Sequence, residues 1–291
     1  MRLDRVEENI RYLFSPEQAQ VATIESGETI TVETRDASNG QIRPGGAGLV
    51  NRARLLPITG PIAVTGAEPG DAIAITIESI RFMPVGHAWI REGNGLRQVR
   101  LETPYHVQAI PVGERVLLPG GLSIPLRPML GIVGVSPEQP VSTRSPGEHG
   151  GNLDCPDISP GNTLWLPVFV PGANVSIGDA HAAMGDGEVS GTGVETEASV
   201  DLTVTLHKRR LLDGPVVATL EKTVFLSSGP TLDGAIRKAL DRAIEAIALN
   251  CHLHEKDAYI VASVSGNIRI CQVVNGNVTV GYEVPREVLP W

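Results

Sequence analysis

Apolar and polar residues alternate along most of the first two thirds of the chain. Ile30 and Val32 fall on one face of an extended segment, and Thr31, Glu33 and Arg35 fall on the other. A period of two is typical of a half-buried β-strand. The same alternation, with short apolar runs between turn residues, predicts further strands at 57–64, 71–80, 106–111, 114–118, 122–126, 163–170, 173–178, 194–206 and 215–226.

A helical period replaces this alternation near the C-terminus. Apolar residues recur every three or four positions over 231–249, which predicts the strongest helix of the chain. A second helix is expected at 254–265 and a strand at 267–274. Close to the N-terminus, apolar residues at helical spacing predict a short helix over 4–13.

One long segment has no clear period. Residues 127–162 are rich in Gly, Pro and Ser, and a loop of that length inside a domain is usually functional or a linker. The pattern of apolar and polar residues changes again after about residue 206. The sequence therefore predicts a mainly antiparallel β body over 1–206, which carries the functional residues, and a smaller α+β part over 207–291.

Composition narrows the class of protein and its partners. The formal net charge is −9 over 291 residues, which disfavours binding to nucleic acid or to acidic membranes. Cys155, Cys251 and Cys271 show no repeated spacing, so a reducing cytoplasm fits better than a disulfide framework. The charged N-terminus and the lack of a long apolar run argue against a signal peptide and a membrane span. We therefore expect a cytoplasmic protein.

Acidic and imidazole side chains gather in the Gly-rich block 145–197. If the segment around Asp179 and His181 is extended, these two side chains share a face and can both bind a metal ion such as zinc. The alternatives are a carboxylate that only orients the imidazole, or an Asx turn at Asp179. His149 lies in a loop of small residues, where it is either a ligand or simply exposed.

Other kinds of active site find little support in the sequence. No Gly-x-Ser-x-Gly elbow and no phosphate-binding Gly-Lys-Ser/Thr loop occurs. Cys155 is a possible nucleophile with His149 or His181 as its base, but no nearby cation in the sequence would stabilise its thiolate.

Four motifs in this block carry a resemblance to a known family. They are His149-Gly-Gly-Asn-Leu-Asp154, Leu166-Pro-Val-Phe-Val-Pro-Gly172, Gly178-Asp-Ala-His-Ala-Ala-Met-Gly-Asp-Gly-Glu188 and Gly193-Val-Glu195. In order and spacing they resemble the acetamidase/formamidase family. Segments around Asp36, at 51–57 and at 131–135 are similar to the family as well, so the resemblance covers most of the chain.

The resemblance implies a fold, a reaction and partners. It implies a jelly-roll-like β-sandwich with an α+β appendage, self-association into a homodimer or larger homo-oligomer, and a divalent metal ion, which is expected to be zinc with calcium as the alternative. The implied reaction is the hydrolysis of formamide, acetamide or similar small amides to a carboxylic acid and ammonia. Two departures from the family pattern, Cys155 and Met184, fall where side chains are expected to line the substrate pocket together with Gly150 and Gly151.

The resemblance also assigns candidate roles to single residues. Glu195 or Glu188 is the candidate general base, and Asn152 or the backbone N–H groups of Gly150 and Gly151 would stabilise the oxyanion. Since a catalytic zinc keeps an open position, the candidate ligands are too many for one ion, and some orient the others or a second ion is present. These candidate ligands are Asp36, His149, Asp154, Asp179 and His181.

Two other functions remain open at this point. The same residues would suit another C–N bond, in a cyclic amide or a urea derivative. A β-sandwich with a structural calcium ion could instead be a binding module without catalysis, although calcium prefers oxygen ligands to imidazole.

Overall fold

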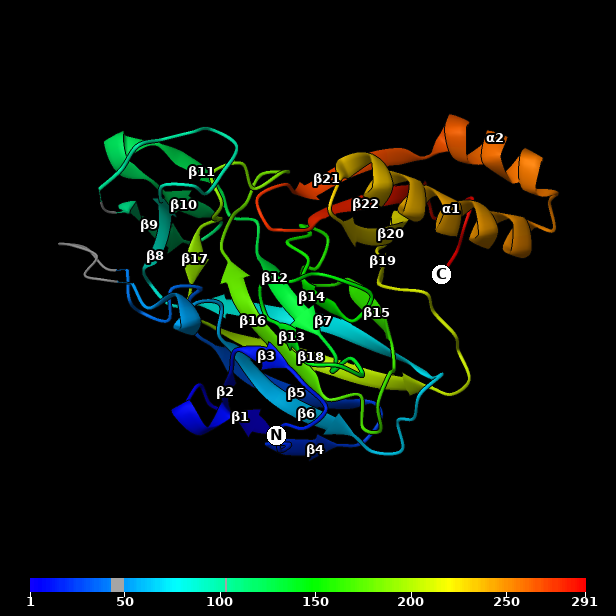
Figure 1. The fold of residues 1–291 in the computed structure, drawn as a ribbon, viewed down its shortest axis with the longest axis horizontal. Helices are drawn as coiled ribbons and strands as arrows, with labels where there is room; N and C mark the ends of the chain where they lie inside the picture. Colours follow the sequence, from blue (N-terminus) through cyan, green and yellow to red (C-terminus); the bar gives the residue numbers. More distant parts are fainter. Residues whose placement is uncertain (43–49, 103) are drawn as a thin grey trace.

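The computed structural model describes residues 1–42, 50–102 and 104–291, and it consists mainly of two large β-sheets (Figure 1). The first sheet has nine strands and runs through the middle of the molecule into its C-terminal part. Its strands, in spatial order, are β1 (Arg2–Leu3), β5 (Glu28–Thr34), β18 (Ala198–His207), β7 (Ala72–Phe82), β15 (Thr163–Pro167), β19 (Val216–Ala218), β20 (Lys222–Gly229), β22 (Val278–Pro285) and β21 (Asn267–Gln272).

The second sheet is branched and carries most of the functional residues. Its main path is β11 (Ser123–Pro125), β10 (Arg115–Leu117), β9 (Tyr105–Val112), β8 (Gly86–Ile90), β17 (Glu195–Thr196), β16 (Val175–His181), β12 (Met129–Gly134) and β14 (Gly150–Asn152). Strand β6 (Ile58–Val64) pairs with β16, and it also pairs with β2 (Ile10–Arg11) and β4 (Ala22–Ile24). A separate pair joins β3 (Leu13–Phe14) to β13 (Val141–Ser142).

The two sheets enclose one large apolar core. Ile30 and Ile75 of the first sheet and Val133 and Ile177 of the second are completely buried in it. Along β18 the buried residues alternate with more exposed ones, as expected for a strand with one face on the core. Packing between the inward faces of two sheets makes this part of the chain a β-sandwich.

Two helices cover the far end of the first sheet (Figure 1). Helix α1 (Leu232–Cys251) packs on β20 and β22, and α2 (Glu255–Ser265) packs beside it. The Thr231 side chain accepts a hydrogen bond from the N–H of Gly234 and caps α1. Buried alanines on the inner faces of both helices allow close contact with the sheet and form a second core.

The expected class, mainly β with a C-terminal helical part, is confirmed. The helices predicted at 231–249 and 254–265 are present, as are strands near the positions where alternation predicted them. Strands β19 to β22 extend the first sheet, so no separate sheet begins at residue 207. The boundary at 206 stays a prediction. Within the described residues, no helix is both long and apolar enough to span a bilayer.

Three segments differ from the expectations. Residues 4–13 form no α-helix, because their backbone instead makes a short 3-10 turn (Glu7–Asn9) and pairs through β2 with β6. The segment 215–226 is two strands joined by a turn. The segment 127–162 contains β12, which is buried on both faces and therefore has no alternation for a sequence pattern to detect.

Candidate active site

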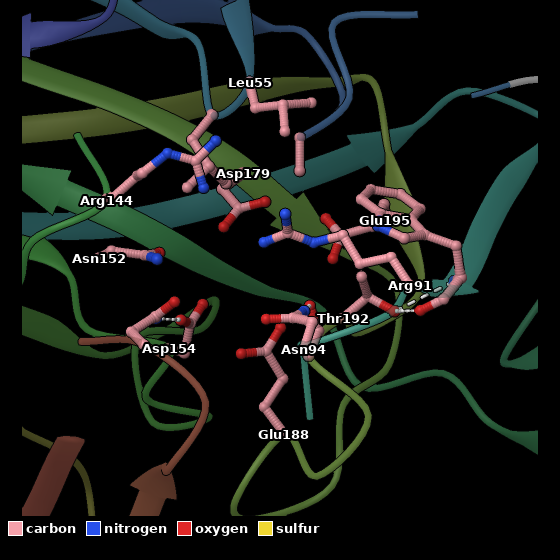
Figure 2. A pocket seen from close by; sticks show the side chains of 15 residues that line it. Leu55, Arg91, Asn94, Arg144, Asn152, Asp154, Asp179, Glu188, Thr192 and Glu195 are labelled. Carbon is pink, nitrogen blue, oxygen red and sulfur yellow. Dashed lines mark hydrogen bonds between the residues drawn. The ribbon is translucent and has the colours of Figure 1, made fainter. Parts of the chain in front are cut away.

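A small cavity lies at one end of the second sheet, where β14, β16 and β17 meet the loops that follow β8 and β16 (Figure 2). Its volume is about 50 Å³, which is room for a few non-hydrogen atoms. Four carboxylates line it, together with two arginines and several amides. The described lining residues are Ala37, Leu55, Leu56, Trp89, Arg91, Asn94, Arg144, Asn152, Asp154, Asp179, Glu188, Gly191, Thr192, Glu195 and Asn275.

Gly131 brings two of these carboxylates together. It lies in β12, between residues that pair with β16, and its carbonyl accepts hydrogen bonds from the N–H groups of Leu153 and Asp154 at 3.0 and 3.1 Å. A Cβ at Gly131 would lie 2.5 Å from Asp154 Oδ1 and 2.8 Å from Asp179 Oδ2. Only glycine therefore leaves space for both side chains at this point.

His181 lies at the centre of the site. It is completely buried, and its Nε2 is 3.3 Å from Asp179 Oδ1 and 3.1 Å from Glu195 Oε2. Glu195 is opposite His181 in the pairing of β16 with β17, which explains the second contact. Glu195 Oε1 accepts a hydrogen bond from the N–H of Gly193 at 3.1 Å.

Glu188 reaches the cavity from the loop between β16 and β17. The C-terminal part of the chain holds this loop, because Gly187 exchanges backbone hydrogen bonds with Cys271 and Val273 at 3.0 and 3.1 Å. The same part contributes Asn275, whose Nδ2 donates to Asp154 Oδ2 at 3.1 Å. The site therefore depends on residues beyond 206 as well as on the β body.

Burial changes the acidity of the whole group. It raises the pKa of Asp154 and of Glu195 well above the usual range, and it raises the pKa of Glu188 to about 8. Burial alone would also raise the pKa of Asp179, but the His181 imidazole outweighs it and the pKa falls. For His181, the carboxylates of Glu195 and Asp179 outweigh burial and raise the pKa well above its usual value. The cluster as a whole favours a positive charge at its centre.

Three of these acidic residues also have an unusual backbone conformation. Asp154, Asp179 and Glu188 have φ values of 46°, 58° and 46°, in the left-handed region that side-chain-bearing residues rarely adopt. Such strain costs of order 1 kcal/mol or more per residue and is typical of functional sites. Three strained acidic residues around one cavity indicate a site selected for its chemistry.

The donor set fits a divalent cation such as zinc. Two groups have their ligand atoms within 4.8 Å of one another, Asp179–His181–Glu195 and Asp154–His181–Glu188. Two ligands of a tetrahedral zinc lie roughly 3.3–3.5 Å apart, given metal–ligand bonds of about 2.0–2.2 Å. The distances from His181 Nε2 to Asp179 and Glu195 are close to that separation. Asp154 Oδ1 is also buried without a hydrogen-bond donor among the described residues.

Two of the five predicted metal ligands lie outside both groups. The Asp36 carboxylate accepts hydrogen bonds from the N–H groups of Ser38 at 2.8 Å and Gly40 at 2.9 Å, and so stabilises the turn next to the cavity. The His149 ring lies against Phe14, and its buried Nε2 has no hydrogen-bond partner among the described residues. Burial lowers the pKa of His149 to about 4, so this imidazole is neutral at pH 7.

The residues predicted to form the substrate pocket do not line this cavity. Gly150 and Gly151 have φ values of 89° and 83° and shape strand β14. Cys155 is buried in the large core, where a hydrogen bond from Cys271 to its thiol, together with burial, raises the pKa of Cys271. Met184 lines a different surface pocket. Asn152, in contrast, lines the cavity, and its Oδ1 has no partner among the described residues.

Sequence reasoning missed several residues of the site. Arg91, Asn94, Arg144 and Asn275 line the cavity, and none of them lies in the block 145–197. The segment 131–135 resembles the family, but nothing in its sequence marks Gly131 as the residue between two carboxylates. No local pattern could have identified these residues, because only the fold brings them to the cavity.

Fold and site together define the class of protein. It is a mainly β protein with a C-terminal helical layer and a cavity built from carboxylates beside a buried imidazole. The acetamidase/formamidase family model matches residues 2–144 and 135–290. The chain belongs to the acetamidase/formamidase family.

Solved structures agree with this assignment. The acetamidase of Bacillus halodurans is 34% identical and superposes with a TM-score of 0.94, over 99% of this chain and 98% of that protein. The acetamidase of Yersinia enterocolitica is 32% identical with a TM-score of 0.93, over 100% of this chain and 93% of that protein. The predicted class, an amidohydrolase acting on linear amides, agrees with the names of these proteins.

Curated relatives are more distant. The acetamidase of Mycolicibacterium smegmatis is 26% identical, over 66% of this chain and 64% of the relative. This chain spans about two thirds of the length of the curated relatives it matches.

Proposed function

We propose that this protein hydrolyses small linear amides to a carboxylic acid and ammonia with the help of a divalent metal ion, which we assign as zinc. The observation that carries the proposal is the cavity of about 50 Å³, which four carboxylates line. The buried imidazole of His181 contacts two of them, Asp179 and Glu195. The size of the cavity suits an amide of a few non-hydrogen atoms, and the names of the family and of the solved relatives support the same reaction.

We assign the metal ion to Asp179, His181 and Glu195. The spacing of their ligand atoms supports this assignment, and a divalent charge there would offset the repulsion among the buried carboxylates. When bound, such an ion lowers the pKa of water towards about 7 and polarises the amide carbonyl. His181 favours zinc over calcium, because calcium prefers oxygen ligands.

Glu188 is then the better candidate for the general base. Glu195 is held by His181 and by the N–H of Gly193, whereas Glu188 points into the cavity from the loop between β16 and β17 (Figure 2). Its pKa of about 8, raised by burial, lies close to neutrality, where a carboxyl group both accepts and returns a proton. Glu188 would take the proton of the attacking water and deliver it to the amide nitrogen as the C–N bond breaks.

Asn152 is placed to stabilise the developing negative charge. Its side-chain amide lies in the cavity wall beside Asp154 (Figure 2). An N–H donor aimed at the carbonyl oxygen is worth about 10²–10³-fold in kcat in comparable oxyanion sites. The neighbouring Asp154, held by Asn275, faces Glu188 across the cavity. Burial, and next the charge of Glu188, raises the pKa of Asp154.

Ammonia release tests the proposal directly. Purified protein is treated with a chelator, dialysed, and assayed with formamide, acetamide and propionamide before and after addition of zinc. We expect hydrolysis that disappears with the metal and returns with about one equivalent of zinc per chain. Full activity in metal-free protein would contradict the role of the metal, and no ammonia from any amide in loaded protein would contradict the reaction.

A further inference from the structure

Two arginine side chains at the rim of the cavity have no part in the reaction described above. Arg91 follows β8, and Arg144 lies between β13 and β14, so the two reach the cavity from separate segments. Both are partly buried. Figure 2 shows both guanidinium groups directed into the cavity, on the side of Asp179.

Neither guanidinium has an anionic partner in the described part of the chain. Arg144 Nη2 donates to the backbone carbonyl of Arg52 at 3.0 Å, and its guanidinium makes no other hydrogen bond or ion pair with a described residue. Arg91 makes no side-chain hydrogen bond or ion pair with any described residue. If these arginines served to neutralise the carboxylates below them, ion pairs with those carboxylates would be expected.

The charged forms of both arginines are disfavoured by burial and by neighbouring positive charge. Burial lowers the pKa of Arg91, and the charges of Arg144 and Arg52 lower it further. Burial likewise lowers the pKa of Arg144, and the charge of Arg52 lowers it further. Like charges held together in a partly buried site form an arrangement that an anion between them would stabilise.

The backbone around Arg91 is fixed in place. Thr192 Oγ1 donates to the carbonyl of Trp89 at 3.0 Å and accepts from its N–H at 3.2 Å. Asn94 Nδ2 donates to the carbonyl of Gly191 at 3.2 Å. The segment that carries Arg91 is thus tied to the loop that carries Glu188, and a positioned donor loses less entropy when it binds a ligand.

These observations indicate the chemistry of the ligand. A guanidinium forms paired hydrogen bonds with the two oxygens of a carboxylate. We propose that Arg91 and Arg144 bind a carboxylate carried by the substrate, so that the preferred substrates are short amides whose carboxylate is bonded directly to the amide carbon or is separated from it by one methylene. This inference rests on the proposed amide hydrolysis and names its substrate class.

The carboxylate formed by the reaction is a different group. Its carbon is the former amide carbon, which must lie at the floor of the cavity beside His181 and Glu188 to be attacked. The rim arginines therefore serve a second carboxylate, already present before the reaction. The cavity volume of about 50 Å³ limits the chain between the two groups to a short one.

Matched pairs of amides test this inference. Malonamate and acetoacetamide differ only by a carboxylate oxygen in place of a methyl group, and oxamate and pyruvamide differ in the same way. In metal-loaded wild-type protein, kcat/KM should favour the carboxylated member of at least one pair by about 10- to 100-fold. Most of the difference should appear in KM, since the arginines contribute to binding in the ground state as well.

Variants show whether the arginines are the cause. Arg91→Gln and Arg144→Gln should each lower the preference about tenfold, and the double variant should bring it close to one. Arg52→Gln is the matched control, because it removes a positive charge from the same corner but no residue that lines the cavity. It should keep most of the preference, whereas a general effect of the electric field would reduce it equally.

Calorimetric titration with malonamate separates this inference from the proposed reaction. Binding that depends on Arg91, without ammonia release from any amide, would support the carboxylate site and contradict the reaction. Equal or greater kcat/KM for the neutral amides would overturn the inference and leave the reaction intact. Arg91-dependent inhibition by acetate without any preference for malonamate would also overturn it, by assigning the arginines to the product.

Discussion

The floor of the cavity and its rim are built in opposite ways. The floor is the cluster of Asp154, Asp179, His181, Glu188 and Glu195, and the rim consists of Arg91 and Arg144. The floor carboxylates and His181 come mainly from strands and the tightly held turns beside them, are almost completely buried, and contact one another. The rim arginines come from loops, are partly exposed, and have no anionic partner among the described residues. The floor therefore contains a nearly complete set of groups for a cation and a proton transfer, whereas the rim still lacks its counter-charge.

The difference separates two tasks that a small active site must perform. Groups that stabilise a transition state must be rigid, and the strained φ values of Asp154, Asp179 and Glu188 show how firmly the fold holds the floor. Groups that select a substrate need only be available when it arrives. We accordingly expect floor substitutions to act on metal content and kcat, and rim substitutions to act on substrate preference.

The largest effect should follow from removal of the central imidazole. His181 belongs to both candidate metal groups, so His181→Ala should abolish tight metal binding and lower kcat by roughly 10³-fold or more. Elemental analysis and ammonia release measure the two effects. His149→Gln is the comparison, because His149 lies outside both groups and this variant should retain its metal. Metal loss in His149→Gln with a folded protein would restore His149 to the ligand set.

A smaller effect should follow from the addition of a single methyl group at Gly131, next to the carboxylates of the floor. In Gly131→Ala the new Cβ would overlap the carboxylates of Asp154 and Asp179, so we expect metal affinity to fall by about 10- to 100-fold. Competition with a zinc-binding dye measures the affinity. In Gly229→Ala the nearest atom to the new Cβ is 3.9 Å away, and that variant should bind metal like the wild type. Equal affinities in the two variants would show that the floor is not held as tightly as described.

The smallest effect is expected at Cys155. Its side chain lies in the apolar core and not in the cavity, so Cys155→Ala should change kcat by no more than about threefold. Ammonia release, with thermal unfolding as the control for folding, measures this. A loss of about 10³-fold in a folded variant would instead indicate thiol catalysis.

The sequence predicted the parts of the fold that have one face on the core. Alternation identified β5, β7 and β18, and a helical period identified α1. It failed for β12, because a strand buried on both faces has no polar positions to alternate with apolar ones. It also failed at residues 4–13, where apolar side chains at helical spacing face different surroundings and the backbone pairs with β6.

The candidate site shows the same limit. Asp154, Asp179, His181, Glu188 and Glu195 lie in one block with a recognisable motif, and the structure brings them together. Asp36 and His149 were included with them as candidate ligands, but the direction of their side chains depends on tertiary contacts that the sequence does not reveal. The expected self-association, cytoplasmic location and lack of nucleic-acid or membrane partners stay predictions.

One paired measurement tests the division of roles within the floor most directly. Metal content and kcat are measured together for Glu188→Gln and Glu195→Gln, with Glu197→Gln, a more exposed residue paired with Arg5, as the control. We expect Glu188→Gln to keep its metal and lose about 10²–10⁴-fold in kcat, because Gln cannot accept a proton. Glu195→Gln should lose metal and recover part of its activity with excess zinc. A Glu195→Gln variant with full metal and low kcat, beside a Glu188→Gln variant with wild-type kcat, would contradict this account and make Glu195 the base.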